Sequence, residues 1–241
     1  MKNKEQIQKS PLGGFRGLRH IPNFITCLNL FSGCVAVWLA FNDNYEGAFL
    51  AVMLSAIFDF FDGFAARLLK AYSPMGKELD SLADMISFGL APGAIVFSLL
   101  NETGINESLP YLAFLIPVFS GLRLAKFNID DRQTSSFIGL PTPANAIFLS
   151  SLAFAYPDFL ITHLWFLVVI TLFFSYLLIA EIPMFALKLK SLAWKENQIQ
   201  YVFLFGSILI LAALQFNAFA LIIAWYIFLS VIYALFVNRK S

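Results

Sequence analysis

The sequence carries little charge for its length. Only 13% of its 241 residues are Asp, Glu, Lys or Arg, whereas a soluble domain usually carries about 25%. Apolar residues make up 59% of the chain, 28 residues are Phe, and the mean hydropathy is +0.76. This composition excludes a disordered chain, a coiled coil and an ordinary water-soluble domain, and it predicts a polytopic membrane protein.

An excess of charge of one sign is also missing. The chain has 16 Lys and Arg residues against 15 Asp and Glu residues, so its formal net charge is +1. No overall field attracts polyanions, and we therefore expect no nucleic-acid partner. Any function that uses charge must depend on where individual charged residues are placed.

Cysteine and histidine are scarce. Cys27 and Cys34 lie in one apolar segment, which favours small packing side chains over a disulfide or a metal pair. His20 and His163 are predicted at opposite faces of the membrane, so they cannot form one site. We expect neither a disulfide framework nor a metal site built from histidine and cysteine.

Long apolar runs are abundant. Runs of about 17–25 residues predict an all-α membrane bundle of about eight transmembrane helices. The predicted spans are roughly 22–41, 46–69, 80–100, 109–127, 140–156, 159–182, 199–215 and 217–237. No connection is long enough for a second soluble domain. We therefore predict a basic cytoplasmic tail at 1–19 and a single integral membrane domain at 20–238.

The basic residues indicate the orientation of these spans. With eight spans, every Lys and Arg falls on one side: before the first span, between the second and third, and after the fourth, sixth and eighth. The loops on the other side contain acidic residues but no Lys or Arg. Because loops rich in Lys and Arg stay in the cytoplasm, both termini are predicted to be cytoplasmic. The protein is predicted to cross the cell membrane several times.

Four acids stand inside the predicted spans. Asp59 and Asp62 lie in the second span, and Asp80 and Asp84 lie in the first turns of the third. An ionised carboxylate in hydrocarbon is unfavourable unless it is paired, solvated or bound to metal. Residues three or four apart share one helix face, and a short connection makes the two spans antiparallel neighbours. We expect the four carboxylates to form one cluster.

A cluster with only oxygen ligands favours hard divalent cations such as Mg²⁺, Mn²⁺ or Ca²⁺. Mg²⁺ is commonly bound by a few carboxylates together with substrate phosphates, which indicates phosphoryl chemistry at one or two ions. A salt-bridged structural cluster and an ion-transport path are the alternatives. Gly63 and Ala66, near the face of Asp59, leave room for a bulky ligand. Arg67 could donate to phosphate or anchor the helix at the membrane interface.

These acids and small residues follow a known signature. The pattern is Asp59-x2-Asp62-Gly63-x2-Ala66-Arg67-x8-Gly76-x3-Asp80-x3-Asp84. It resembles the signature of the CDP-alcohol phosphotransferases, membrane enzymes that transfer a phosphate-linked group from a CDP-linked donor to an alcohol. The resemblance implies that Asp59, Asp62 and Asp80 hold a pair of divalent cations, Mg²⁺ or Mn²⁺. It implies that Asp84 also helps to hold a metal and acts as the general base. The cytidine diphosphate would be accommodated by Gly63, Ala66, Arg67 and Gly76.

Segments outside the signature resemble one branch of this family, the integral-membrane phosphatidylserine synthases. They are Pro22-Asn23-x2-Thr26-x2-Asn29, Arg123-Leu124-Ala125-Lys126-Phe127-Asn128 and Gly139-Leu140-Pro141-Thr142-Pro143-Ala144. This resemblance implies CDP-diacylglycerol and L-serine as substrates, an active site that faces the cytoplasm, a homodimer, and a catalytic core at about 20–185. The family core has fewer spans than the chain, so the last two spans are left without a role.

The polar residues of the first of these segments share one helix face. Asn23, Thr26 and Asn29 are spaced three residues apart. They could meet the cytidine of the donor or hydrogen-bond to a neighbouring helix. Asn23 and Thr26 are therefore further candidates for donor binding.

Arg123 and Asn128 are predicted at the cytoplasmic end of the fourth span. A guanidinium binds a carboxylate through two parallel hydrogen bonds, so both residues are candidates for binding an acceptor such as serine. The alternative is that Arg123 and Lys126 are ordinary cytoplasmic anchors. Glu181, near the end of the sixth span, has no predicted role.

Other functions would use the same acids. An enzyme that acts on glycerol 3-phosphate or inositol phosphate is expected to need more basic residues around its acceptor. A membrane prenyltransferase also uses Asp-rich helices, Mg²⁺ and a diphosphate donor, but its motifs lack the pattern of Gly63, Ala66, Arg67 and Gly76. An ion-coupled transporter could place acids in two spans, and it would not release CMP.

Overall fold

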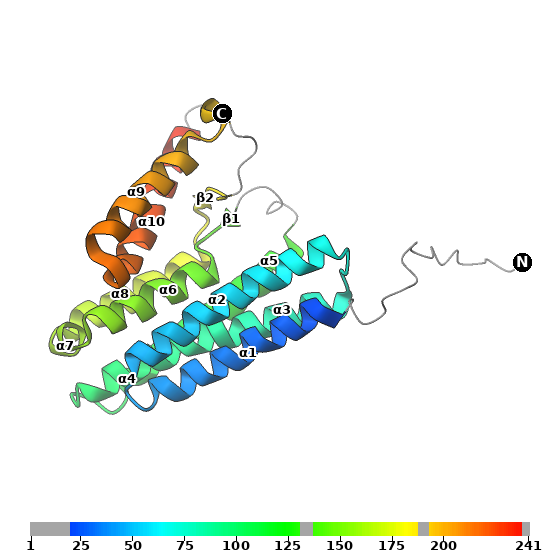
Figure 1. The fold of residues 1–241 in the computed structure, drawn as a ribbon. Coiled ribbons are helices and arrows are strands. Elements are labelled where there is room, and N and C mark those ends of the chain that lie inside the picture. The colour runs from blue at the N-terminus through cyan, green and yellow to red at the C-terminus, as the bar shows by residue number, and fades with distance from the viewer. Residues whose placement is uncertain (1–19, 131–136, 188–192, 238–241) are drawn as a thin grey trace, which may run out of the picture.

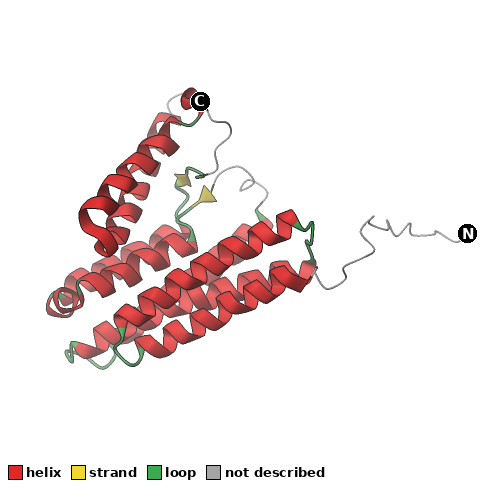
Figure 2. Ribbon diagram, viewed as in Figure 1, coloured by secondary structure: helices red, strands yellow, loops and turns green. Residues whose placement is uncertain are grey.

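The computed structural model describes residues 20–130, 137–187 and 193–237. The predicted basic tail at 1–19 and several of the cations used for orientation lie outside these ranges. Within them the chain is helical except for loops and two short strands (Figure 2). The prediction of an all-α bundle is confirmed in this coarse form.

The first half of the chain forms long helices that lie side by side (Figure 1). The α1 and α2 helices are antiparallel and pack along their length. The next two segments each combine an α-helix with a different helix type, since η2 is a π-helix and η3 is a 3-10 helix. The elements are α1 (Ile21–Ala40), α2 (Tyr45–Leu68), α3 (Pro74–Asp84), η2 (Met85–Leu90), α4 (Ala91–Glu102), η3 (Leu109–Phe114) and α5 (Leu115–Ile129).

The α3 helix begins earlier than the apolar run predicted. Ser73 caps it by accepting a hydrogen bond from the Gly76 amide at 2.9 Å, and Pro74 takes the first helical position. Both residues are typical helix starts. Because these residues begin the helix at Pro74 and not near residue 80, Asp80 and Asp84 lie beyond its first turn. The predicted start of this span near residue 80 is therefore wrong, whereas Asp80 and Asp84 still lie in the early part of the stretch Pro74–Glu102.

The second half of the chain starts with a small clasp between two strands. Phe137 pairs with Met184 in the antiparallel sheet. Gly139 has a φ of +78°, and a Cβ there would lie 2.6 Å from the Leu178 carbonyl oxygen. Only glycine fits such a position without strain. The elements are β1 (Phe137–Ile138), α6 (Thr142–Ala155), α7 (Pro157–Thr162), α8 (Leu164–Ile179) and β2 (Pro183–Met184).

The last two helices form a hairpin inclined to the rest of the bundle (Figure 1). The α10 helix packs on α6 and on β2, whereas α9 packs chiefly on α10. None of the residues of α9 is buried. The hairpin is therefore attached to the bundle through α10. Its elements are η5 (Trp194–Glu196), α9 (Gln198–Leu214), η6 (Gln215–Ala218) and α10 (Phe219–Val237).

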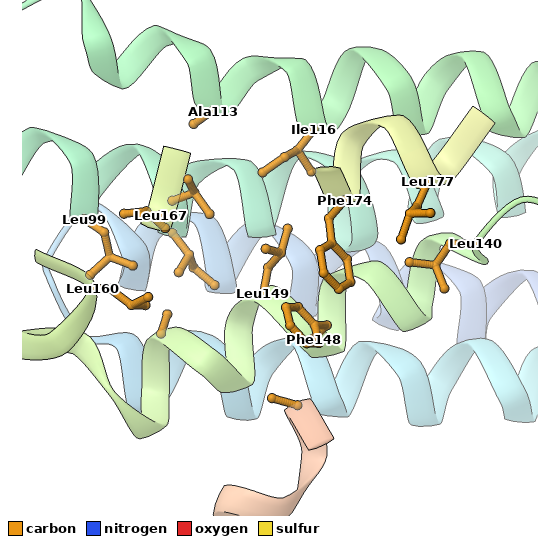
Figure 3. Close-up of a cluster of buried hydrophobic side chains, with 14 of the residues drawn as sticks. Leu99, Ala113, Ile116, Leu140, Phe148, Leu149, Leu160, Leu167, Phe174 and Leu177 are labelled. Atoms are coloured by element: carbon orange, nitrogen blue, oxygen red, sulfur yellow. The ribbon is translucent and has the colours of Figure 1, made fainter. Parts of the chain in front are cut away.

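Close packing between helices holds the bundle together. The rings of Phe148 on α6 and Phe174 on α8 stack with centroids 3.9 Å apart, in the middle of the buried cluster shown in Figure 3. A Cβ on Gly93 would lie 2.9 Å from Pro117 Cδ, so α4 and α5 approach through a glycine. Lipid tails are as apolar as these side chains, so such packing, and not exclusion of water, is expected to supply the cohesion.

Five stretches of the described chain are long and apolar enough to cross a membrane. Two further apolar helices, α6 and α8, are shorter, and the last of the five stretches contains both α9 and α10. The number of crossings predicted from the sequence is therefore not established by length and composition. The five stretches are Ile21–Ala40, Tyr45–Leu68, Pro74–Glu102, Leu109–Ile129 and Gln198–Leu235.

The two cysteines do not pack inside the bundle. Cys27 and Cys34 are both free, as expected, but both are exposed on the outer face of α1. The interpretation of these residues as packing side chains is wrong, because their helix buries the opposite face, on which Thr26, Asn29 and Gly33 lie.

Candidate active site

Three of the four predicted acids lie together where α2 faces α3. One carboxylate oxygen from each of Asp59, Asp62 and Asp80 lies within 4.8 Å of the others. Asp62 is 5% exposed, and its Oδ2 has no hydrogen-bond partner among the described residues. A buried oxygen without a donor, beside two further carboxylates, is a set of ligands that fits Mg²⁺ or Mn²⁺.

Asp84 lies one turn further along α3 and is 9% exposed. Its electrostatic neighbours include Asp59 and Asp80. The Asn29 amide donates to Asp84 Oδ1 at 3.4 Å. Three of the four predicted acids therefore share one cluster, and Asp84 lies one turn further along, hydrogen-bonded to α1.

Contacts from α2 and η2 fix the position of Asn29. Its backbone carbonyl accepts hydrogen bonds from Ser55 on α2 at 3.2 Å and from Ser87 on η2 at 3.0 Å. A Cβ on Gly33 would lie 2.8 Å from the Ser87 Cα, so α1 and η2 are in close contact. The η2 π-helix begins directly after Asp84, and such turns are frequent at functional sites. Asp84 is thus held by a rigid junction of helices.

A cavity of about 240 Å³ borders the acids at the start of α1 and α3 and the end of α2. It brings together five residues predicted to bind the donor, Asn23, Thr26, Gly63, Ala66 and Gly76, beside Asp62 and Asp80. The full lining is Pro22, Asn23, Thr26, Asp62, Gly63, Ala66, Ala71, Tyr72, Ser73, Gly76, Lys77 and Asp80.

Sequence reasoning missed three polar residues of this lining, namely Tyr72, Ser73 and Lys77. Lys77 stands three residues before Asp80, which places both on one face of α3. That spacing could have identified Lys77 as a site residue. The polar connection before α3 looked like an ordinary loop; Ser73 carried only the signal of a helix cap, and Tyr72 carried none.

One residue predicted to bind the donor lies outside this cavity. Arg67 is exposed and does not line the cavity. A Cβ on Gly76 would lie 2.9 Å from Asn23 Oδ1, so this glycine also lets α3 approach α1. A Cβ on Gly63 would have no atom within 4 Å. Gly63 is therefore the glycine that opens space without a packing reason.

Arg123 is 7% exposed, so it is not a cytoplasmic anchor. Its Nη1 donates to Thr142 Oγ1 at 3.3 Å, and its guanidinium carbon lies 5.4 Å from the centroid of the Phe127 ring. Its Nε has no partner among the described residues. Asp84 is its electrostatic neighbour. The guanidinium therefore lies inside the bundle near the carboxylates.

Lys126 behaves as the sequence suggested for a surface cation. It forms an ion pair with Glu181 at 3.1 Å, and both side chains are exposed. Glu181, which had no predicted role, therefore links the region after α8 to α5. An exposed pair of this kind contributes about 0–1 kcal/mol.

Asn128 joins the end of α5 to α3. Its side-chain amide donates to Ser81 Oγ at 2.9 Å, and its backbone carbonyl accepts from Lys77 Nζ at 3.1 Å. Lys77 also lines the cavity. Asn128 therefore lies at the rim of the site, with its amide already engaged.

Comparison with known proteins assigns the region that holds this site. The family model described as CDP-alcohol phosphatidyltransferase matches residues 19–177. The match contains the four acids, the cavity lining and Arg123. It ends before α9 and α10.

Three similar proteins bear the name CDP-diacylglycerol–serine O-phosphatidyltransferase. The Bacillus subtilis protein is 36% identical over 169 residues, which is 68% of this chain and 89% of that protein. The Mycobacterium leprae protein is 34% identical over 178 residues, covering 69% of this chain and 58% of the relative. The Saccharomyces cerevisiae protein is 38% identical over 152 residues, covering 56% of this chain and 54% of the relative. The chain belongs to the CDP-alcohol phosphatidyltransferase family.

Proposed function

We propose that the protein transfers a phosphatidyl group from CDP-diacylglycerol to L-serine and releases CMP. The observation that carries the proposal is the carboxylate cluster beside a cavity lined by small residues. The names of the similar proteins support serine as the acceptor.

The donor is proposed to place its cytidine diphosphate in the cavity and its acyl chains in the bilayer. Small side chains leave room for the nucleotide, and Arg67 would reach the phosphates from outside the lining. The residues proposed to bind the donor are Asn23, Thr26, Gly63, Ala66, Arg67 and Gly76.

Asp59, Asp62, Asp80 and Asp84 are proposed to hold two divalent cations, Mg²⁺ or Mn²⁺. When bound, such ions would neutralise the charge of the diphosphate and of the leaving CMP. The buried Asp62 oxygen without a donor supports this assignment.

Asp84 is proposed to take the proton of the serine hydroxyl. The serine oxygen then forms a bond to the phosphorus attached to diacylglycerol, and the bond from that phosphorus to the CMP oxygen breaks. No covalent enzyme intermediate is needed. Asn29 would orient Asp84. Arg123 would bind the carboxylate of the acceptor, and Asn128 would bind the acceptor from the rim of the site.

The same proposal includes the placement of the chain. The one-sided distribution of Lys and Arg supports eight crossings of the cell membrane with both termini in the cytoplasm. The catalytic core at about 20–185 would lie within one membrane domain at 20–238, with the active site facing the cytoplasm. A homodimer is the proposed assembly.

The test is CMP release by the purified protein in detergent with CDP-diacylglycerol and Mn²⁺ or Mg²⁺. We expect release that depends on L-serine and stops when the metal is chelated. Glycerol 3-phosphate and inositol phosphate are the comparison acceptors. CMP release with one of these acceptors in place of serine would show that serine is not the acceptor but would leave the proposed metal site standing. No CMP release with any acceptor would reject transfer from CDP-diacylglycerol to an alcohol.

Gly63→Ala separates a role in donor binding from a role in packing. The added methyl group points into open space of the cavity, so the KM for CDP-diacylglycerol should rise several-fold. Thermal stability should be unchanged or higher, because Ala is a better helix former than Gly by about 1 kcal/mol. Steady-state kinetics and thermal unfolding in detergent measure the two effects.

Gly206→Ala is the control for this prediction. A Cβ there would lie 2.4 Å from Trp225 Nε1, between α9 and α10. This variant should lower the melting temperature without a comparable change in the KM for the donor. A Gly63→Ala enzyme with a normal donor KM would show that the cavity does not hold the nucleotide.

A further inference from the structure

A second group of buried polar side chains lies where α5, α6 and α10 meet. Arg123 comes from α5, Thr142 and Asn145 come from α6, and Tyr226 comes from α10. The α6 and α10 helices pack directly on one another (Figure 1). Asp84 is an electrostatic neighbour of this group through Arg123.

Several polar atoms of this group lack the partners that burial demands. Asn145 is fully buried, and neither its Nδ2 nor its Oδ1 has a hydrogen-bond partner among the described residues. The Nε of Arg123 is also buried and has no hydrogen-bond partner among the described residues. Thr142, which accepts from Arg123, is three residues before Asn145, so both lie on one face of α6. Buried donors and acceptors left unpaired are unfavourable, and a polar ligand would satisfy them.

Tyr226 brings α10 into this group. It is 5% exposed, and its hydroxyl donates to the Phe185 carbonyl at 3.0 Å. The donated proton fixes the hydroxyl, and its oxygen can accept hydrogen bonds, with the Ser230 side chain as one neighbouring donor. Arg123 is its electrostatic neighbour. The residue lies beyond 19–177, the part of the chain that matches the family model.

We propose that Asn145 and Tyr226 complete the acceptor site around Arg123 and bind the ammonium group of an α-amino acid. The inference rests on the proposed function and specifies its acceptor site. A carboxylate needs N–H donors, which Arg123 supplies at Nε. An ammonium group needs oxygen acceptors, which the Asn145 amide and the Tyr226 hydroxyl supply. The acceptor hydroxyl would then lie toward Asp84.

This arrangement favours an amino acid over a phosphorylated alcohol. Glycerol 3-phosphate and inositol phosphate carry no ammonium group for Asn145 and Tyr226. The proposed acceptor site also gives a role to the final hairpin. Its α10 helix, which packs on α6, would close the site, and α9 packs on α10.

The experiment measures KM values for L-serine and for CDP-diacylglycerol in detergent-purified enzyme. Asn145→Ala and Tyr226→Phe should each raise the KM for serine by about tenfold, the loss expected for one hydrogen bond to a charged group. The KM for the donor should stay within about twofold of its original value. Tyr233→Phe is the matched control, because it makes the same change at an exposed tyrosine of α10. It should alter neither constant.

Two inhibitors separate ammonium binding from a structural effect. L-alanine has the carboxylate and ammonium groups but no hydroxyl, and 3-hydroxypropionate has the carboxylate and hydroxyl groups but no ammonium. Inhibition by L-alanine should weaken about tenfold in Asn145→Ala and Tyr226→Phe. Inhibition by 3-hydroxypropionate should be unchanged in both variants.

The outcomes are distinguishable from a failure of the proposed function. If the original enzyme does not use serine, the proposed function fails and this inference fails with it. If it uses serine and both variants keep a normal serine KM, only this inference is overturned. Equal weakening of both inhibitors, or an equal rise in both KM values, would also overturn it, because the cluster would then be structural. If Asn145→Ala does not fold, Tyr226→Phe and the two inhibitors still decide the question.

Discussion

Asp84→Asn is expected to lower the rate of CMP release by about 10²–10⁴-fold, the contribution typical of a general base. The amide has nearly the shape of the carboxylate, and its oxygen can still accept the hydrogen bond from Asn29. It cannot take the proton of the serine hydroxyl. Asp84 does not line the cavity and lies outside the triad of Asp59, Asp62 and Asp80, so the affinity for CDP-diacylglycerol should fall far less than in variants of that triad. Single-turnover CMP release and equilibrium donor binding with Mn²⁺ measure the two quantities.

Glu78→Gln is the control for this result, because Glu78 is an exposed acid on the same helix. It should leave both the rate and the donor affinity unchanged. Near-normal turnover in Asp84→Asn would remove Asp84 from the role of base. The proton would then have to go to another group of the cluster, such as the neighbouring Asp59 or Asp80.

The acidic cluster could be predicted because its determinants are local. Asp59 and Asp62 share a face of α2, Asp80 and Asp84 share a face of α3, and both helices pack on α1 so that the carboxylates meet. Helix periodicity and loop length are properties that one sequence displays directly. The predicted start of α3 is too late because it was taken from the beginning of the apolar run, whereas the helix begins at the cap formed by Ser73.

The environment of Arg123 could not be predicted, because it depends on helices far away in the chain. At the end of an apolar run, an arginine has the sequence pattern of a cytoplasmic anchor. The structure buries it because α6 places Thr142 against the guanidinium. Asn145 was passed over for the same reason, since one amide in an apolar helix carries no pattern. Tyr226 lies in a helix that is apolar on all sides, where no periodicity marks the face turned to α6.

The π-helix after Asp84 also left no mark in the sequence. Met85 to Leu90 reads as a continuation of the apolar run, and the wider turn arises from tertiary contacts. The close contact between Gly33 and Ser87 and the hydrogen bond from Ser87 to Asn29 both lie at this turn. The residues that orient Asp84 thus belong to three elements, and only their packing reveals that they act together.

Asp59→Asn is expected to weaken donor binding itself, in contrast to Asp84→Asn. The oxygens of Asp59, Asp62 and Asp80 lie within 4.8 Å of one another, so each is placed to share the same cation. Even partners outside the ligand shell are worth about 10–100-fold in metal affinity. Loss of a ligand should therefore raise the Mn²⁺ concentration needed for half-maximal CDP-diacylglycerol binding by at least about 100-fold. Donor binding measured across a Mn²⁺ titration provides the readout.

Asp158→Asn is the control, since Asp158 is exposed on α7 and belongs to no part of the site. It should bind the donor with the original dependence on Mn²⁺, and Asp80→Asn should resemble Asp59→Asn. Loss of binding without Asp59 and loss of rate without Asp84 would show that Asp59 serves chiefly to hold metal and Asp84 chiefly as the base. An Asp59→Asn enzyme that binds the donor with unchanged Mn²⁺ dependence would contradict the metal assignment, and the close approach of the three carboxylates would then require bound protons.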